Sequence, residues 1–166
     1  MPGIRRQKKM YSRPRKPFEL DRITEENEVV TKYGLKNKKE LWRADAAISK
    51  IRNIAKKLIT APSNEQEAFI ARLAKKGLLQ VGSKMDNVLD LKKEDHLERR
   101  LQTIVLKKGF AKTAKQARQL VTHKYVKVGD RIINIPSYNV SVDEEQKISV
   151  MPQKVKAEKK PVMEVA

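Results

Sequence analysis

The side chains of this sequence that offer a chemistry are its cations, because lysine and arginine bind phosphate groups through charge-assisted hydrogen bonds. The chain holds 38 lysines and arginines against 20 aspartates and glutamates, a formal net charge of +18 over 166 residues. Such a chain repels itself, and a polyanion relieves that repulsion by supplying the opposite charge. The composition therefore indicates a polyanionic partner, with nucleic acid and an anionic membrane surface as the candidates.

One basic segment lies at the N-terminus, where residues 1–16 carry seven basic side chains and no acidic one. Pro2, Pro14 and Pro17 discourage a helix there, so we expect an extended arm. The arm is either a solvated tail or a strand that threads through RNA, and the interleaved Tyr11, which could stack on a base, favours RNA. Its candidate RNA contacts are Arg5, Arg6, Lys8, Lys9, Tyr11, Arg13, Arg15 and Lys16.

The second basic segment is residues 97–142, which hold ten basic side chains against Glu98 and Asp130, a net charge of +8. Residues 143–166 are neutral by contrast, with five side chains of each sign. The charge is thus concentrated in two places. The basic residues of the second segment are Arg99, Arg100, Lys107, Lys108, Lys112, Lys115, Arg118, Lys124, Lys127 and Arg131.

Residues for catalysis or metal binding are scarce. The chain has two histidines, His96 and His123, and no cysteine, so a structural zinc site with its usual four ligands cannot be built. It has no Gly-rich phosphate loop, nucleophile elbow or His-Glu-x-x-His pattern, and we expect no enzyme activity, no metal and no cofactor. His123 is either a cation at a helix end or a contact to a phosphate or base, and the sequence leaves both open.

A membrane association finds little support. No stretch approaches the roughly 18–20 apolar residues that span a bilayer, and residues 1–16 lack the apolar core of a secretory signal. We therefore expect a cytoplasmic location.

Helical signals dominate the first half of the chain. Residues 19–33 read as a helix ended by Gly34. Asn37 and Glu40 have the spacing of a capping box, and the apolar stripe that follows predicts a helix of about 18 residues. Ser63 and Gln66 repeat the same spacing before a shorter helix closed by Gly77, and a loop is expected over 78–90.

In the second half of the chain, the spacing of apolar residues changes from helical to alternating. A helix is expected from about Glu94 to Lys108, with Gly109 as its end, and Thr113 with Gln116 forms a third capping box before another helix. After His123, apolar residues alternate. Strands are expected at 126–128, 133–135 and 148–150, with a two-residue turn at Gly129 and Asp130.

The sequence therefore predicts an α+β fold, mostly α. A basic arm at 1–18 would precede a helical N-terminal domain at 19–96, a two-helix and small antiparallel sheet module at 97–150, and a flexible tail at 151–166.

The module at 97–150 resembles the S-four RNA-binding module. The resemblance rests on Arg100-Leu101-Gln102, Lys108-Gly109-Phe110-Ala111, the run TAKQARQLV from Thr113 to Val121, and HKYVKV from His123 to Val128. It spans about 45 residues. Ala114 stands where that family usually has arginine, so no RNA contact is carried over to that position, and Gly129-Asp130 replaces the family's Asn-Gly turn.

The wider chain is similar to the archaeal type of the ribosomal S-four family, through RRQKKMYSRPRKPFE, KYGLKNKKELWRA and LERRLQTIVLKKGFAKTAKQARQLV. The resemblance implies a structural protein of the small ribosomal subunit that binds its rRNA first and nucleates assembly of the subunit body. It also implies contact with ribosomal protein S-five, at an interface linked to translational accuracy. Some relatives carry N-terminal cysteines that bind a metal, and this chain has none.

With the helices packed inward on their apolar stripes, the basic side chains of the module are candidates for an outer, RNA-facing surface, to which the helix start at Thr113 would add backbone donors. We expect Arg118→Glu to weaken RNA binding without unfolding the chain. The candidate rRNA contacts here are Arg100, Lys107, Lys108, Lys112, Thr113, Lys115, Arg118, His123, Lys124 and Lys127.

Three other functions remain as alternatives. The helix, glycine turn and helix of the module have the layout of a helix-turn-helix DNA binder, although no dimerisation element is evident. An RNA-modifying enzyme can carry such a module as an accessory, although residues 19–90 show no catalytic constellation. A polybasic membrane-surface protein would need an apolar face left over after the core is packed.

Overall fold

The computed structural model describes residues 10–80 and 82–151. The predicted class, α+β and mostly α, is confirmed by helices along most of the described chain and one small antiparallel sheet. In chain order the elements are α1 (Leu20–Lys32), α2 (Lys38–Leu58), α3 (Ser63–Lys75), α4 (Met85–Leu89), α5 (Lys93–Glu98), α6 (Leu101–Lys107), α7 (Ala114–Thr122), β1 (Val126–Val128), β2 (Arg131–Ile132), α8 (Val142–Glu145) and β3 (Ile148–Val150).

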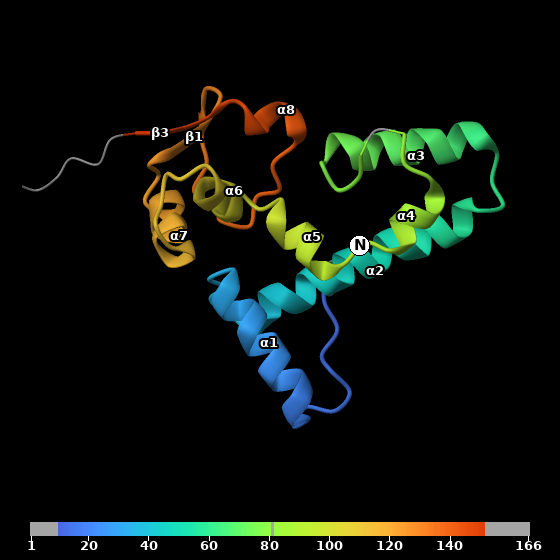
Figure 1. Cartoon of the computed structure of the whole chain (residues 1–166), viewed down its shortest axis with the longest axis horizontal. Coiled ribbons are helices and arrows are strands. Elements are labelled where there is room, and N and C mark those ends of the chain that lie inside the picture. Colours follow the sequence, from blue (N-terminus) through green and yellow to red (C-terminus); the bar gives the residue numbers. More distant parts are fainter. Residues whose placement is uncertain (1–9, 81, 152–166) are drawn as a thin grey trace, which may run out of the picture.

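The long helix α2 spans the space between two groups of elements (Figure 1). At one end of the view, α6 and α7 lie beside the sheet, and at the other end α3 and α4 lie along α2, while α1 projects away from both groups. Buried apolar residues form three clusters. The largest lies wholly within 101–148, the second joins α2 to α3 and α4, and the third joins α1, α2 and Leu97 of α5.

Helix α1 ends where the sequence predicts. Gly34 has φ +58°, and the amides of Gly34 and Leu35 donate to the carbonyls of Thr31 and Val30, which closes the last turn. A methyl group on Gly34 would lie 2.8 Å from the Cβ of Ala114, so the residue also permits a close approach between α1 and the start of α7.

The apolar stripe predicted for α2 is confirmed as core. Leu41, Ala44, Ile48 and Ala55 are buried on one side of the helix. The helix is 21 residues long and runs to Leu58. It therefore offers one continuous surface on which α1, α3, α4 and α5 pack.

Two of the three predicted capping boxes are wrong. Asn37 does precede α2, but its side chain makes no cap hydrogen bond, and Glu40 binds arginines of the second half instead of reaching back. Helix α3 begins at Ser63 with Pro62 at the N-cap. The side-chain amide of Gln66 donates to backbone carbonyls in the preceding turn. The main contact of the third capping box is confirmed, because the hydroxyl of Thr113 accepts a hydrogen bond from the backbone amide of Gln116 at 3.2 Å.

The region 78–108 differs from the prediction in two ways. The expected loop contains the short helix α4, whose Val88 is fully buried against α2. The helix expected from Glu94 to Lys108 is interrupted, because Arg100 is extended and pairs with Asn139 as an isolated β-bridge. The Leu101 amide donates to the Tyr138 carbonyl at 2.8 Å, so backbone from the far end of the module terminates α5 and starts α6.

The sheet has the order β2-β1-β3, and both pairs are antiparallel. Val128 pairs with Arg131 across Gly129 and Asp130, which confirms the two-residue turn, and Gly129 has φ +59°. The strand predicted at 133–135 lies two residues earlier, at 131–132. The last strand is confirmed at Ile148–Val150.

Helix α8 was not predicted. Its N-cap Ser141 and Glu144 form a capping box, in which the Ser141 amide and hydroxyl both donate to the Glu144 carboxylate, at 3.0 and 2.9 Å. The same Ser-x-x-Glu spacing could have located this helix from the sequence.

Candidate nucleic-acid interface

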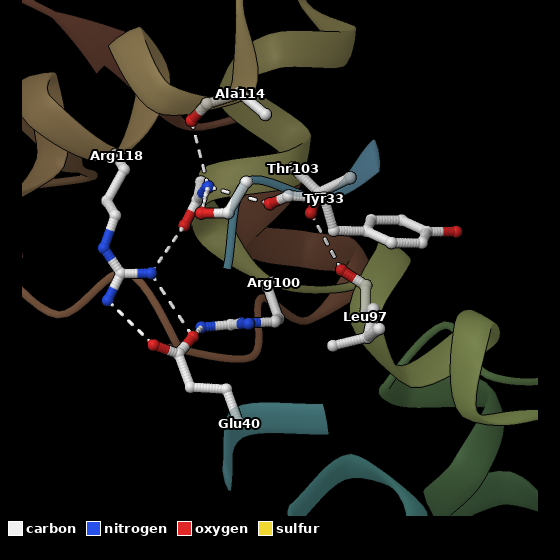
Figure 2. A network of polar contacts seen from close by, with 9 residues as sticks. Tyr33, Glu40, Leu97, Arg100, Thr103, Ala114 and Arg118 are labelled. Atoms are coloured by element: carbon white, nitrogen blue, oxygen red, sulfur yellow. Dashed lines mark hydrogen bonds and ion pairs between the residues drawn. The ribbon is translucent and has the colours of Figure 1, made fainter. Parts of the chain in front are cut away.

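One carboxylate, that of Glu40 on α2, binds two arginines of the second half of the chain (Figure 2). Arg100 Nη2 lies 2.6 Å from Glu40 Oε2, and Arg118 Nη2 lies 2.9 Å from Glu40 Oε1. Arg118 Nη1 also donates to Glu40 Oε2 at 3.3 Å. One carboxylate thus holds two guanidinium groups, one from the start of α6 and one from the middle of α7.

The Glu40 carboxylate titrates below its ordinary range. Burial alone would raise its pKa, but hydrogen bonds and charge from Arg118 and Arg100 outweigh burial, so the pKa is lowered from 4.5. Glu40 is therefore ionised at neutral pH, and it neutralises one of the two positive charges that it contacts.

Gln102 of α6 forms the second part of this junction. It is buried, and its Nε2 donates to the carbonyls of Tyr33, Gly34 and Ala114 at 3.0, 3.2 and 2.9 Å. Two of these carbonyls lie at the end of α1 and the third at the first residue of α7. The hydroxyl of Thr103, one position on, donates to the Leu97 carbonyl at 2.8 Å. Buried backbone groups from both halves are therefore satisfied by side chains of α6.

These contacts correct the predicted outer surface. Arg100 is only 4 % exposed, so the expectation that it lies on the outer face is wrong. Arg118 is half-buried, with both terminal nitrogens on Glu40. Arg118→Glu would set a second carboxylate against Glu40, so we now expect this change to lower the stability of the fold as well as to weaken RNA binding. No local pattern could have found the junction, because its partners are 60 and 78 residues apart.

Three further cations of the second segment contact acceptors within the chain. Arg99 pairs with Glu145 at 2.7 Å and donates to the Val140 carbonyl. Lys107, although exposed, pairs with Glu98 at 2.8 Å, and the ammonium of the exposed Lys108 donates to the backbone carbonyl of Glu145. Lys107 and Lys108 sit in water, where such contacts exchange easily.

The solvent-exposed side of α7 presents what we call the outer face of α7. It consists of Lys115, Gln116, Gln119 and Thr122, all exposed, whereas Ala117, Leu120 and Val121 on the opposite side are buried. Lys112, just before the helix, is also exposed. No acidic residue occurs between Glu98 and Asp130, so this face has cations and neutral polar groups alone. Such a surface suits a phosphate backbone.

The chain that follows α7 continues this surface. His123 and Lys124 are exposed, and Tyr125 and Lys127 are half-buried. The rings of His123 and Tyr125 are nearly parallel, with an interplanar angle of 8° and centroids 6.5 Å apart. Thr113, at the other end of the helix, is exposed but uses its hydroxyl as the N-cap.

The described part of the N-terminal arm lies against α2. The rings of Tyr11 and Trp42 are 6.1 Å apart, and Trp42 donates from Nε1 to the buried Glu26 carboxylate at 3.1 Å. Burial raises the pKa of Glu26, but hydrogen bonds from Trp42 and Arg22 outweigh it and lower the pKa. Arg13, Arg15 and Lys16 are exposed, whereas Arg5, Arg6, Lys8 and Lys9 lie outside the described residues.

Within residues 10–80 and 82–151, no group of three or more histidine and acidic side chains is placed to hold a metal ion. No helix in that same part of the chain has the length and apolar character needed to cross a membrane.

Comparison with known proteins identifies the family. Residues 99–145 match the S4 domain family. The chain is 45 % identical over 154 residues to a protein of Korarchaeum cryptofilum named small ribosomal subunit protein uS4, covering 91 % of this chain and 93 % of that one. A protein of the same name from Methanothermobacter thermautotrophicus is 43 % identical over 152 residues, covering 89 % of each. The chain belongs to the uS4 family.

Family membership confirms the resemblance predicted from the sequence, including its archaeal character. Members of the uS4 family are structural proteins of the ribosome and not enzymes, so the prediction of a non-enzyme is confirmed as well. A ribosomal protein resides in the cytoplasm on the ribosome, as the sequence predicts.

Proposed function

We propose that this chain is a structural component of the small ribosomal subunit that binds its rRNA through the outer face of α7 and the segments that flank it. The observation that carries the proposal is the acid-free stretch between Glu98 and Asp130, in which Lys112 before α7 and Lys115 on it are exposed to solvent. The names of the relatives and the S4 domain match support the same role.

The binding mode follows from the geometry. Lysines at fixed spacing contact phosphates, and each neutralised phosphate releases counterions. Shape and backbone are what such a face can read in a folded RNA, because base edges in an A-form helix are hidden in a deep groove. The proposed contacts in the described part of the module are Lys107, Lys108, Lys112, Lys115, His123, Lys124 and Lys127, and the exposed arm residues Arg13, Arg15 and Lys16 extend the surface.

Arg100 and Arg118 have a different part in this proposal. Their guanidinium groups are held by Glu40, so they orient α6 and α7 on α2 instead of offering free charge. The helical half and the basic module then present their cations to RNA in a fixed relation.

Binding is tested with small-subunit rRNA transcribed from an archaeal relative and a duplex DNA of equal length as competitor at one salt concentration. We expect rRNA to compete at least tenfold better than duplex DNA, and cross-links to map to the lysines of the α7 face. Equal competition by DNA would favour the helix-turn-helix alternative and contradict the proposal. Flotation with anionic vesicles addresses the membrane-surface alternative.

We further propose that the chain binds early and nucleates assembly of the subunit body. A protein whose two halves are joined by buried contacts can hold two rRNA segments together before other proteins arrive. Reconstitution of the small subunit without this chain should lose the body proteins that bind later, and adding it back first should restore them. Normal binding of those proteins in its absence would overturn the nucleating role.

We propose that α1 contacts ribosomal protein S-five and supports translational accuracy through this contact. Phe18 is 89 % and Leu20 75 % exposed at the start of this projecting helix (Figure 1). Asp21, Glu25 and Glu28 are exposed on it too, so this face repels RNA phosphates and suits a basic protein. Phe18→Ser with Glu25→Lys should weaken S-five binding and change the misreading rate, whereas Glu67→Lys on α3 should change neither.

A further inference from the structure

The aromatic pair at the end of α7 has a geometry that phosphate binding does not require. The His123 imidazole and the Tyr125 phenol are separated by one residue, yet their planes differ by only 8° and their centroids are 6.5 Å apart. Tyr125 packs against the core cluster of the module and is half-buried, whereas His123 is exposed. The pair is therefore a stack with one end fixed in the core and the other end open to solvent.

The backbone between the two rings creates this arrangement. Lys124 has φ +65°, in the left-handed region, where it is the single residue other than glycine among those that the structure describes. The amides of Lys124 and Tyr125 donate to the carbonyls of Val121 and Leu120, at 3.0 and 3.1 Å, so the turn closes α7 and sets the rings on the same side. Glycine would adopt this conformation without the steric strain that a side chain brings. Lysine occupies position 124 despite this steric strain, and it places a cation there.

Charge around the pair favours a nucleotide. His123, Lys124 and Lys127 lie within the acid-free stretch, and Lys124, between the two aromatic residues in the chain, is exposed. In the described part of the chain the His123 ring makes no hydrogen bond with another side chain or with the backbone. Because His123 is exposed, its ring is accessible to a ligand. An unstacked base beside its own phosphate matches a flat aromatic face next to a lysine.

We propose that an unpaired rRNA base stacks on the His123–Tyr125 pair, with Lys124 on an adjoining phosphate. The inference rests on the proposed rRNA-binding function and adds a contact of another kind. The lysines of the α7 face read the phosphates of a folded RNA, whereas this pair selects a place where one base is out of the helix. Its ligand is a single-stranded nucleotide within a structured RNA.

The test uses the full chain and small-subunit rRNA, with affinity measured at several salt concentrations. We expect His123→Ala to weaken binding by roughly 5- to 150-fold, the change that corresponds to the loss of about 1–3 kcal/mol of base stacking, without altering the log–log salt slope. His123→Phe should keep the affinity within about twofold, because a phenyl ring still offers a stacking face. Lys124→Gly tests the phosphate contact, and it should reduce the slope by about 0.7 without lowering the melting temperature.

Ultraviolet cross-linking of the wild-type complex supplies an independent readout. The nucleotide joined to His123 or Tyr125 should be unpaired in the rRNA. A cross-link confined to paired nucleotides would overturn the stacking site. So would equal losses of affinity for His123→Ala and His123→Phe, or no loss for His123→Ala. Failure of the wild-type chain to bind rRNA at all would instead overturn the proposed function, and this inference with it.

Discussion

Arg118 and Lys115 lie three residues apart on α7, and both are cations of the same acid-free stretch. Arg118 is held by the Glu40 carboxylate of α2 and is half-buried, whereas Lys115, its neighbour on the helix surface, is exposed. Arg118 therefore uses its charge to join two halves of the protein, and Lys115 leaves its charge for a partner.

The contrast shows that a count of cations overstates the charge available to RNA. Arg99, Arg100 and Arg118 are satisfied by carboxylates within the chain, so they contribute orientation and little free charge. The cations of the acid-free stretch that are exposed are all lysines. This division fits the chemistry of the two side chains, because the planar guanidinium group pairs with carboxylates in a fixed geometry and the ammonium group acts as a mobile point charge.

The largest effect on this comparison should come from reversing Glu40. Glu40→Lys would place a third cation beside Arg100 and Arg118, and we expect it to lower the free energy of unfolding by about 3 kcal/mol, near the lower end for breaking a buried ion pair. Urea unfolding followed by circular dichroism measures this. Glu28→Lys, on the exposed face of α1, is the charge-matched control and should change stability little. A loss below about 1 kcal/mol for Glu40→Lys would mean that the junction acts as a surface pair.

Removing the amide of Gln102 should have the next largest effect. Gln102→Leu keeps the size of the side chain but leaves the carbonyls of Tyr33, Gly34 and Ala114 without their donor. We expect a loss of about 2 kcal/mol, within the range for buried polar groups left unpaired. Thermal melting provides the measurement, and Gln119→Leu on the exposed side of α7 serves as the control. Equal stability of the two variants would show that the carbonyls find other donors.

A matched pair of charge reversals separates the roles of Lys115 and Arg118 directly. Lys115→Glu should leave the melting temperature unchanged, weaken rRNA binding about tenfold and reduce the salt slope by about 1, as expected for a lost phosphate contact. Arg118→Glu should lower the melting temperature, because its carboxylate would face Glu40. If Arg118→Glu proved as stable as Lys115→Glu, the joining role of Arg118 would be wrong.

The smallest effect is a pH dependence of stability. The folded-state pKa of Glu40 is lowered from 4.5, because the bonds from Arg118 and Arg100 outweigh the opposing effect of burial. A group with a depressed pKa stabilises the fold above its unfolded pKa and loses that contribution as the pH falls through the folded value. The stability difference between wild type and Glu40→Gln should therefore be constant near neutral pH and shrink below about 4.5. A difference that stayed constant down to pH 3 would show that Glu40 does not titrate in this way.

The features that the sequence predicted correctly depend on neighbours in the chain. Gly34, Thr113 and the turn at Gly129 follow from local backbone rules, and each lies where those rules put it. The stripe on α2 and the class of fold follow from periodicity, which also acts over a few residues.

Apart from α8, whose local capping box was overlooked, the main features that the sequence missed depend on distant partners. Glu40 satisfied the spacing of a capping box, but two guanidinium groups from residues 100 and 118 compete for it more strongly than one backbone amide does. The helix expected up to Lys108 is broken by the backbone of Tyr138 and Asn139, which no local pattern near Arg100 reveals. Arg100 is buried as well, so the candidate site loses it as an exposed cation.

The distance along the chain between Glu40 and its partners also sets the order in which the contacts can form during synthesis. Glu40 meets Arg100 and Arg118 across 60 and 78 residues, and Gln102 meets Tyr33 across 69. Helices α1 and α2 therefore leave the ribosome long before the residues that complete their buried contacts exist. Closing loops of this size is entropically slow compared with forming a helix, so docking of the two halves should be a late step in folding. A newly made chain would expose the Tyr33 and Gly34 carbonyls and the Glu40 carboxylate until α6 and α7 arrive.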